Sequence, residues 1–354
     1  MRKKRILITG GCGFVGSHIG LILLENNFEI TIVDSNINSS SKVIDNIIRI
    51  SNNKNECSKD NISFIKGDLR DINFVNDLFT NSAKEGKSFD CVIHLSGLKS
   101  VSDSIHMPIQ YWESNVSCTI NLLKVMEKFN SYNLIFSSSA GIYDANKNTP
   151  LKETDQLNPI SPYGKTKLAI ENILEDLYVS NKDRWNILCL RYFNPIGAHP
   201  SGLIGEYPIS NSNNIFPLIL KTASSKIKML RIFGNDWPTP DNTCVRDYIH
   251  VMDLAEGHVK GLYWLINKKS QFLKLNLGSG YGTSILELIN LFEKVNKVKI
   301  PYKFAIRREG DVATLIADIS MANKILGWKP KRDLSQMCID SWRWHLLNPN
   351  GYIN

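Results

Sequence analysis

The sequence predicts an α/β protein with a doubly wound parallel sheet and a smaller C-terminal α/β lobe. Short apolar segments alternate with helical segments through residues 5–192, a spacing that favours parallel strands joined by right-handed crossovers. The first apolar segment runs into a glycine-rich turn, Gly10 to Gly16, and the second ends at Asp34. Together these features predict a dinucleotide-binding Rossmann-type domain.

Composition limits the classes of function. The chain has 354 residues, 43% of them hydrophobic and 21% charged, which is typical of a globular protein with a substantial core. The formal net charge is +8, but the only tight basic run is Arg2 to Arg5. We therefore expect no nucleic-acid partner. Most of the basic excess is interpreted as solvated surface, and a few arginines as ligands of a small anion.

The cysteines predict free thiols in a reducing compartment. There are seven of them, an odd number, without a Cys-x-x-Cys pair or a Cys/His spacing suited to a metal. The N-terminal apolar run Ile6 to Ile8 stops at Thr9, far short of a signal core or a membrane span. A cytoplasmic protein with no metal and no membrane partner is expected.

The first strand-turn-helix unit predicts the cofactor site. A strand at Arg5–Thr9 is followed by the glycine turn and a helix at 17–26, whose free N–H groups favour a pyrophosphate. The second strand, 29–33, leads to Asp34, which is placed to accept hydrogen bonds from ribose hydroxyls and to repel a 2′-phosphate. NAD is therefore expected rather than NADP. The alternative is that Asp34 is only a turn residue beside Ser35 and Asn36.

The alternation then continues along the chain. Strands are expected at 62–66, 90–95, 133–136 and 185–192, and the last of these is expected to close the sheet. Helices are expected at 74–83, at 108–129 and from Tyr163 onward. Residues 52–60 are expected to form a polar surface loop. Ligands bind beyond the carboxyl ends of such strands. Asp68 is thus a candidate for the adenine end, and Leu95 to Lys99 for the pyrophosphate and ribose.

Tyr163 and Lys167 are the candidate catalytic pair. Residues four apart stack on one face of a helix, so the ammonium is expected to favour ionisation of the phenol, whose ordinary pKa near 10 is too high for a base at neutral pH. A Tyr-x-x-x-Lys spacing also arises by chance on helix surfaces. Ser137 to Ser139 follow a strand, where serines usually form a turn, but Ser139 lies on the predicted crevice rim as a partner for a reacting hydroxyl.

After residues 193–195 the regular alternation ends. Helices are expected at 215–225, 255–266, 285–295 and 334–347, and short strands at 229–233 and 245–250. We therefore predict a cofactor-binding domain at 1–193, and a region at 194–354 that is mainly a substrate lobe, with allowance for one segment returning to the main sheet.

Motifs along nearly the whole chain resemble a known family. Thr9–His18, Ile93–Lys99, Phe136–Ala140 and Ser161–Lys165 are similar to the extended short-chain dehydrogenase/reductase superfamily. Within it, the chain resembles the UDP-glucose 4-epimerase family in four further motifs: Leu190–Gly202, Ile232–Asp236, Val245–Leu254 and Arg307–Asp311.

The resemblance implies a reaction. UDP-glucose and UDP-galactose would be interconverted through a transient 4-keto sugar, with a tightly held NAD regenerated in each turnover. Tyr163, kept as a phenolate by Lys167 and the nicotinamide charge, would take the proton of the 4-hydroxyl, while Ser139 orients that hydroxyl. Related epimerases are commonly homodimers, so a homodimer is expected.

The cofactor and substrate residues follow from the same resemblance together with the motifs. The expected NAD ligands are Gly10, Gly13, Phe14, Val15, Gly16, Asp34, Ser35, Asn36, Asn38, Ser39, Asp68, Leu69, Leu95, Ser96, Gly97, Lys99, Asn115, Ser139, Tyr163, Lys167 and Phe193. The expected UDP-sugar ligands are Lys99, Ser139, Tyr163, Asn194, Asn214, Ile215, Arg231, Phe233, Arg246, Tyr248, Arg308, Asp311 and Leu315.

Three residues depart from the family pattern. Gly141 stands where the family usually has a hydroxyl residue, and Asp144 replaces a common glycine. Leu315 occupies the position that tunes pocket size, where tyrosine is associated with exclusion of N-acetylated sugars and a small residue with their acceptance. Leucine is intermediate, so a 4-epimerase acting also or mainly on UDP-N-acetylglucosamine and UDP-N-acetylgalactosamine remains an alternative.

Other classes fit the sequence less well. A 4,6-dehydratase would be expected to carry Asp-Glu after Ser139, where this chain has Ala140 and Gly141. A UDP-glucuronate epimerase would resemble residues 202–253 less closely. A non-catalytic sugar-nucleotide sensor could have lost Tyr163 or Lys167, yet both are present.

Overall fold

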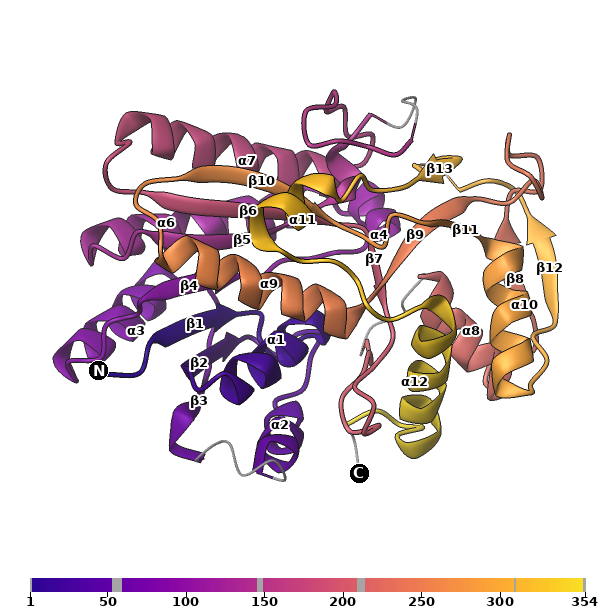
Figure 1. The fold of residues 1–354 in the computed structure, drawn as a ribbon, viewed down its shortest axis with the longest axis horizontal. Helices are drawn as coiled ribbons and strands as arrows, with labels where there is room; N and C mark the ends of the chain where they lie inside the picture. The colour runs from indigo at the N-terminus through magenta and orange to yellow at the C-terminus, as the bar shows by residue number, and fades with distance from the viewer. Residues whose placement is uncertain (1, 53–58, 145–148, 209–213, 309, 353–354) are drawn as a thin grey trace.

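A seven-stranded parallel sheet forms the centre of the protein, as the sequence predicts. The computed structural model describes residues 2–52, 59–144, 149–208, 214–308 and 310–352. The strand order is β10-β6-β5-β4-β1-β2-β3 (Figure 1). The strands are β1 (Arg5–Thr9), β2 (Glu29–Asp34), β3 (Ile62–Lys66), β4 (Cys91–His94), β5 (Asn133–Ser139), β6 (Asn186–Tyr192) and β10 (Phe272–Leu277). The doubly wound fold class is therefore confirmed.

Helices cover both faces of this sheet, because the buried strands present apolar side chains alternately to each side. Ile6 and Ile8 face a cluster that includes α1 (Phe14–Glu25), α2 (Val43–Asn52) and α9 (Val251–Ile266). Leu7 faces the opposite cluster with α3 (Ile72–Lys84), α6 (Cys118–Lys128) and α7 (Pro162–Ser180). Each face thus has its own apolar layer.

The main sheet does not end at β6, so the expectation that residues 185–192 close it is wrong. β10 pairs in parallel with β6, from Phe272 opposite Ile187 to Leu277 opposite Tyr192. Its sequence alternates lysine and asparagine with leucine, and its first three residues are only half-buried. Because of these polar residues, the sequence has no continuous apolar run that would predict a buried strand here.

The helix expected at 108–129 is found at 108–128, but its middle turn is π-helical. It consists of α5 (Pro108–Tyr111), the π-helical segment η2 (Trp112–Ser117) and α6, and the short helix α4 (Val101–His106) precedes it. Such π segments are often found at functional sites. The buried side chain that this one turns inward is Asn115.

The C-terminal lobe has its own small sheets and core. The first sheet contains β7 (Asn194–Ile196), β9 (Val245–His250), β11 (Gly282–Ser284) and β13 (Thr314–Leu315), and the second pairs β8 (Leu230–Phe233) with β12 (Tyr302–Ala305). α8 (Ile215–Ala223), α10 (Ile285–Asn296) and α12 (Leu334–Leu347) pack around them. The remaining elements are α11 (Ser320–Leu326) and the short helices η1 (Lys59–Asn61) and η3 (Ala140–Ile142).

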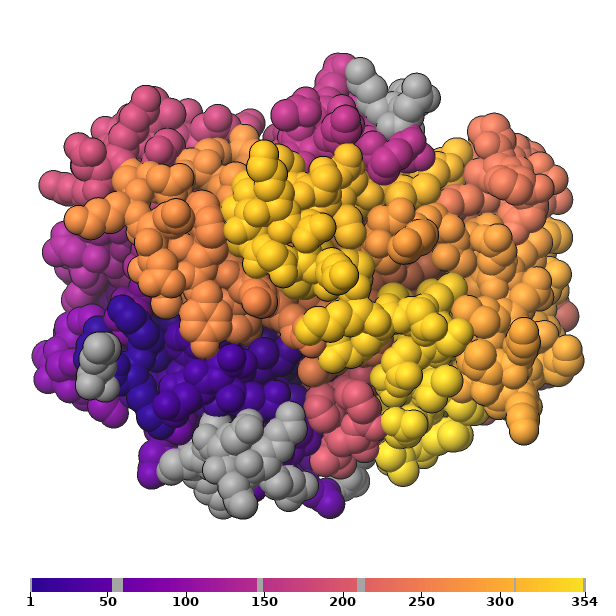
Figure 2. All heavy atoms as spheres, in the orientation of Figure 1, coloured from indigo at the N-terminus to yellow at the C-terminus, as the bar shows by residue number. Residues whose placement is uncertain are grey.

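The lobe faces the carboxyl ends of the main-sheet strands (Figure 1). In Figure 2 a pink segment from around residue 200 lies between the indigo N-terminal part and the yellow C-terminal part. This segment is bonded to both, since Asn46 of α2 donates to the Leu203 carbonyl and Asn348, after α12, donates to the Gly202 carbonyl. The domain boundary predicted at residue 193 stays a prediction. α9 and β10 follow this boundary in the sequence, but they pack with the main sheet.

Two further findings concern the chemistry of the chain. Six cysteines of the described residues are free and buried, and Cys57 lies outside the described residues, as does most of the predicted 52–60 loop. Across the described ranges, no helix is long and apolar enough to cross a membrane.

Candidate active site

The glycine turn between β1 and α1 has the geometry of a phosphate cradle. Gly10 has φ +68°, and a Cβ there would lie 2.8 Å from the Ser96 amide nitrogen. A Cβ at Gly16 would lie 2.6 Å from the Gly10 carbonyl oxygen. The first turn of α1 contains no acidic residue, and no side chain caps it. Its N–H groups and its dipole are therefore available to an anion, which fits a dinucleotide pyrophosphate.

Asp34 is held beside this turn at the end of β2. Its Oδ2 accepts the Cys12 N–H at 3.0 Å, and its Oδ1 accepts the Asn36 N–H at 2.9 Å and the Ser39 hydroxyl at 2.8 Å. These bonds fix the carboxylate without using all of its lone pairs. The arrangement fits an acceptor for ribose hydroxyls and shows that Asp34 also organises its own turn.

Asn115 holds the loop after β4. Its Oδ1 accepts the Leu98 N–H at 2.7 Å, and its Nδ2 donates to the Leu98 carbonyl at 3.1 Å and to the Thr166 hydroxyl at 3.0 Å. Gly97 fits beneath it with φ +145°. Both amide donors are thus engaged within the protein, so Asn115 positions the Leu95 to Lys99 loop against α7.

Two predicted cofactor residues are paired with other side chains. Asp68 accepts a bidentate bond from Arg70, with 2.7 Å between Oδ2 and Nη2, and this hydrogen bond holds the pKa of Asp68 below its ordinary value. Lys99 reaches across to Glu206, 3.0 Å away. The other predicted cofactor residues lie around the ends of β1, β2, β3 and β4 or in the first turn of α1: Gly13, Phe14, Val15, Ser35, Asn38, Leu69, Leu95 and Ser96.

The candidate catalytic pair lies at the start of α7. The Ser161 hydroxyl caps this helix by accepting the Gly164 N–H, and Pro162 occupies its first position, as is typical of a helix N-terminus. Tyr163 and Lys167 follow on one buried face, with exposed fractions of 8% and 5%. The cap thus fixes where α7 begins, and with it the position of Tyr163 next to the end of β5.

Ser139 is the last residue of β5, so the strand expected at 133–136 extends through the three serines, and the alternative that they form only a turn does not apply. The strand pairs with β6 as far as Ser139 opposite Tyr192. The Ser139 oxygen accepts the Gly141 N–H at 3.1 Å, and the hydroxyl is near enough to Tyr163 to lower the pKa of its phenol. At Gly141 a Cβ would lie 3.4 Å from the Ser139 oxygen and 3.9 Å from the Tyr163 ring, so this glycine leaves room beside both groups.

The charge relation between Lys167 and Tyr163 differs from the expectation. Burial raises the pKa of Tyr163 above 10, and only the Ser139 hydrogen bond opposes this. Burial lowers the pKa of Lys167 to about 8, opposed by Cys118 and Glu171. The ammonium donates to the Ser137 carbonyl at 2.9 Å and lies 4.8 Å from the centre of the Phe136 ring. Lys167 is therefore committed to β5, and the side chains alone do not make Tyr163 a phenolate.

A buried ion pair behind the catalytic pair was not predicted. Glu171 on α7 and Arg191 on β6 have side chains 0% and 1% exposed, with 2.6 Å between Oε2 and Nη2. Glu171 also accepts the Ser138 hydroxyl at 2.6 Å, and Arg191 donates to the Tyr143 oxygen at 3.0 Å. The signal was present, because Glu171 lies eight residues after Tyr163 on the same face of the helix.

The C-terminal lobe brings an anion-binding group together. Arg246 of β9 lies 3.9 Å from Asp311, and Arg308 lies 3.2 Å from the other oxygen of the same carboxylate. The Arg308 guanidinium also stacks 4.5 Å from the centre of the Phe233 ring. Arg246, Asp311 and Arg308 are neither fully buried nor fully exposed. Two arginines beside one aromatic ring suit a diphosphate linked to a flat base.

Asp247 anchors the loops around this group and was also missed. It is fully buried, and its Oδ1 accepts both the N–H and the hydroxyl of Ser279, at 2.6 and 2.7 Å. Its Oδ2 accepts the Gly280 and Ala317 N–H groups, at 3.0 and 3.1 Å. Burial raises the pKa of Asp247, against these bonds. The carboxylate ties three chain segments together next to Arg246.

The remaining predicted substrate residues do not all lie at the site. Leu315 pairs with Arg246 in β13 and packs in the cluster that contains Phe193 and Ala140, so it lies between the two halves of the site. Tyr248 is buried in the lobe core, and within the described residues its hydroxyl has no hydrogen-bond partner. Other positions are as follows: Asn194 donates to the Asp247 carbonyl, Asn214 and Ile215 start α8, and Arg231 is exposed on β8.

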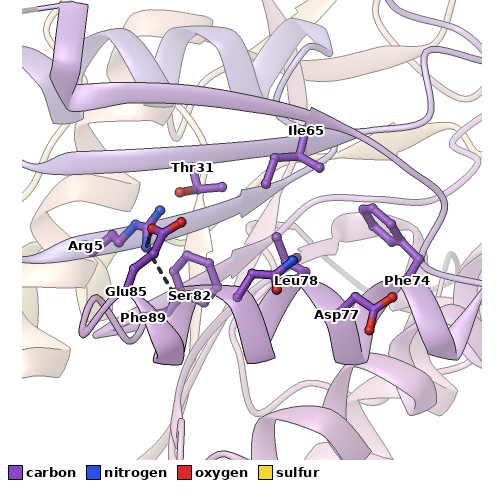
Figure 3. A pocket seen from close by; sticks show the side chains of 10 residues that line it. Arg5, Thr31, Ile65, Phe74, Asp77, Leu78, Ser82, Glu85 and Phe89 are labelled. Carbon is purple, nitrogen blue, oxygen red and sulfur yellow. Dashed lines mark hydrogen bonds and ion pairs between the residues drawn. The ribbon is translucent and has the colours of Figure 1, made fainter.

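A separate pocket of about 220 Å³ lies elsewhere (Figure 3). Arg5 and Glu85 lie at one end of it and Phe74 and Asp77 at the other. It lies between α3 and the strands β1, β2 and β3, and none of its lining residues is among the predicted site residues. Among the residues that the structure describes, no cluster of His, Cys, Asp and Glu could hold a metal ion.

Comparisons with known proteins agree with this geometry. The family model described as GDP-mannose 4,6 dehydratase matches residues 7–341. A UDP-glucose 4-epimerase from Bacillus subtilis is 44% identical and covers 98% of each chain.

Two solved structures are similar in fold as well. A UDP-glucose 4-epimerase from Stenotrophomonas maltophila, with bound NAD and formylated UDP-arabinopyranose, gives a TM-score of 0.91 at 40% identity, over 98% of this chain and 99% of that one. An epimerase from Bifidobacterium longum with NAD+ and UDP also gives 0.91, at 39% identity, over 98% and 100%. With its glycine cradle, its Ser-Tyr-Lys group and relatives aligned along their whole length, the chain belongs to the UDP-glucose 4-epimerase family of the extended short-chain dehydrogenase/reductase superfamily.

Proposed function

We propose that the protein interconverts UDP-glucose and UDP-galactose by NAD-dependent epimerisation at C4. The observation that carries the proposal is the meeting of Ser139 and the start of α7 at the carboxyl edge of a dinucleotide-binding sheet, opposite the Arg246 and Arg308 group. The relatives with bound NAD and UDP support this combination of ligands.

Tyr163 acts as the base in this proposal. It takes the proton of the sugar 4-hydroxyl and returns it after the 4-keto sugar has turned over. Bound NAD would supply a reversible hydride acceptor and a positive charge. That charge is needed, since burial raises the pKa of Tyr163 and an opposite charge nearby favours the ionised form.

Ser139 and Lys167 support the same proton transfer. The Ser139 hydroxyl, which is near enough to Tyr163 to lower the pKa of its phenol, orients the reacting hydroxyl between them. Lys167 keeps its ammonium beneath this group through the Ser137 carbonyl. These side chains hold the reacting atoms, and the separate lobe holds the nucleotide, so the sugar is free to rotate between two half-reactions.

The nucleotide is assigned to the C-terminal lobe. Arg246 and Arg308 pair with the diphosphate, and the Phe233 ring beneath Arg308 provides an apolar surface for the base. The cofactor ligands remain those of the sequence-based list, with Asn115 acting by positioning the loop that contains Gly97.

A second candidate substrate is the N-acetylated pair of UDP-sugars. Leu315 packs near Phe193, and Gly141 leaves space beside Ser139 and Tyr163. Compared with a tyrosine at position 315 and a hydroxyl residue at position 141, both residues leave more space between the two halves of the site. Side-by-side assays with UDP-galactose and UDP-N-acetylgalactosamine decide whether the protein acts on one of these substrates or on both.

The proposal is tested by incubating NAD-loaded protein with UDP-galactose and following UDP-glucose by NMR. The expected result is conversion without added reductant. Tyr163→Phe is expected to lower kcat by at least about 10²-fold, since general base catalysis contributes that much, with UDP binding retained. Tyr281→Phe is the matched control, because Tyr281 is 77% exposed in the β10–β11 turn. Absence of UDP-glucose in the wild-type reaction would show that the proposal is wrong.

We also propose that the protein is a cytoplasmic homodimer. The buried free thiols suit a reducing compartment, and the resemblance carries the expectation of a dimer. Sedimentation equilibrium tests the oligomeric state, and a monomer at micromolar concentration would contradict it.

A further inference from the structure

The second serine of the Ser137–Ser139 run has no part in the chemistry proposed above, yet it is fully buried. Side chains alternate across a strand, so Phe136 and Ser138 face α7, where Phe136 packs in the cluster that contains Ile170. Ser137 faces the other side, where its hydroxyl meets His258 of α9. A buried hydroxyl lowers stability unless it is bonded, and therefore the partner of Ser138 decides what it does.

That partner is a carboxylate on the catalytic helix. The Ser138 hydroxyl donates to Glu171 Oε1 at 2.6 Å, and one helical turn earlier Lys167 donates to the Ser137 carbonyl at 2.9 Å. Consecutive residues of β5 are thus bonded to residues four apart on α7. On α7, Tyr163 lies one turn before Lys167, and on β5, Ser139 directly follows Ser138.

Arg191 fixes the carboxylate from the opposite side. Its Nε lies 3.0 Å from Glu171 Oε1 and its Nη2 lies 2.6 Å from Oε2. Arg191 stands beside Ser138 in the register of β5 and β6. Charge-assisted bonds of this fork type are directional and strong, so Glu171 is locked to the sheet and not only to its own helix.

We infer that Ser138 and Glu171 form a tether that sets α7 against the end of β5 and thereby positions Ser139 and Tyr163 for proton transfer. The inference rests on the proposed function. Both are positioning residues, because neither touches the reacting hydroxyl. Catalysis depends on such placement, since a displacement of about 1 Å can lower the rate about 10²-fold.

The structure offers a matched pair of variants. Ser138→Ala and Tyr143→Phe each delete one buried hydroxyl bonded to the Glu171–Arg191 pair, Ser138 to the carboxylate and Tyr143 to the guanidinium. Tyr143→Phe also removes the 2.6 Å bond to Asn276. Only Ser138 adjoins Ser139. A purely structural role predicts the same effect of both changes on kcat, whereas a positioning role predicts a loss of kcat in Ser138→Ala alone.

The experiment measures kcat and KM for UDP-galactose in the NAD-loaded wild type and both variants, well below each variant's own Tm. The near-ultraviolet absorbance of reduced nicotinamide after addition of the sugar is followed in parallel. We expect kcat of Ser138→Ala to fall about tenfold, with KM within about twofold, and kcat of Tyr143→Phe to stay within about twofold. Ser138→Cys keeps a donor at this position, although the thiol is a weaker donor and a larger group. Its kcat is expected to lie between those of the wild type and Ser138→Ala, and it replaces the alanine variant if that variant does not fold.

The outcomes are distinguishable. If the wild type converts UDP-galactose and the Ser138 variants keep full kcat, or lose no more than Tyr143→Phe, the tether is overturned and the proposed function stands. If the wild type itself gives no conversion, both the proposed function and the tether are wrong.

Discussion

Replacing Glu171 by leucine tests how the buried ion pair contributes to stability. Glu171 and Arg191 are almost completely inaccessible to solvent, and three hydrogen bonds of 3.0, 3.3 and 2.6 Å join them. The substitution leaves the guanidinium buried without its counter-charge. Breaking one side of a buried pair typically costs about 3–5 kcal/mol, and the surviving Arg191 bonds to Tyr143 and the Glu153 carbonyl place the expected value at the lower end.

The magnitude converts to a measurable shift. An unfolding entropy of about 2.1 cal/mol/K per residue over 354 residues gives about 0.7 kcal/mol/K, so 3–5 kcal/mol lowers Tm by about 4–7 °C. The assay is thermal and urea unfolding of the wild type, Glu171→Leu, Arg191→Leu and the double variant. The double variant is expected to recover at least half of the loss, because replacing both charges removes the uncompensated one.

Two results would refute this reasoning. A loss below about 1 kcal/mol in Glu171→Leu would mean that water or another group compensates Arg191. A double variant no more stable than either single variant would mean that the loss comes from packing and not from the unpaired charge.

Three further predictions concern cofactor, substrate and pH. Gly16→Ala is expected to weaken NAD binding at least tenfold in a fluorescence titration, because its Cβ would lie 2.6 Å from the Gly10 carbonyl oxygen. Gly20→Ala is the control, since its Cβ would meet nothing closer than 3.5 Å. Equal NAD affinity in both variants would contradict the assignment of the glycine turn as the phosphate site. Leu315→Tyr is expected to lower turnover of UDP-N-acetylgalactosamine more than that of UDP-galactose, and an equal effect on both would remove Leu315 as the gate. Burial lowers the pKa of Lys167 from 10.5 to about 8, so the unfolded chain binds more protons between these values and stability rises with pH in that window. Between pH 7 and pH 10 the wild type should therefore gain about 2 kcal/mol of unfolding free energy relative to Lys167→Met, as urea unfolding at both pH values would show; a constant difference would mean that Lys167 titrates normally.

The sequence predicts the local elements well where one segment carries its own signal. The Gly10 to Gly16 turn, the strand before it and the helix after it follow from glycine sterics and apolar runs, and Pro162 marks the start of α7. β10 carried no such signal, because Lys274 and Asn276 interrupt its apolar residues. Their partners, Glu175 for the lysine and Tyr143 and the Leu151 carbonyl for the asparagine, are far away in the sequence. The π-helical segment that turns Asn115 inward is likewise a product of packing and not of propensity.

The candidate site shows the same division. Residue types and spacing identified Ser139, Tyr163 and Lys167, because a base needs a phenol with a hydroxyl and a cation near it. Only the tertiary structure decided that Lys167 is bonded to β5 and that burial raises the pKa of Tyr163. It also decided that Glu171 faces Arg191 across α7 and β6. The physical reason is range: spacing along one helix fixes which side chains share a face, whereas desolvation and ion pairing depend on strands far away in the sequence that pack against that face.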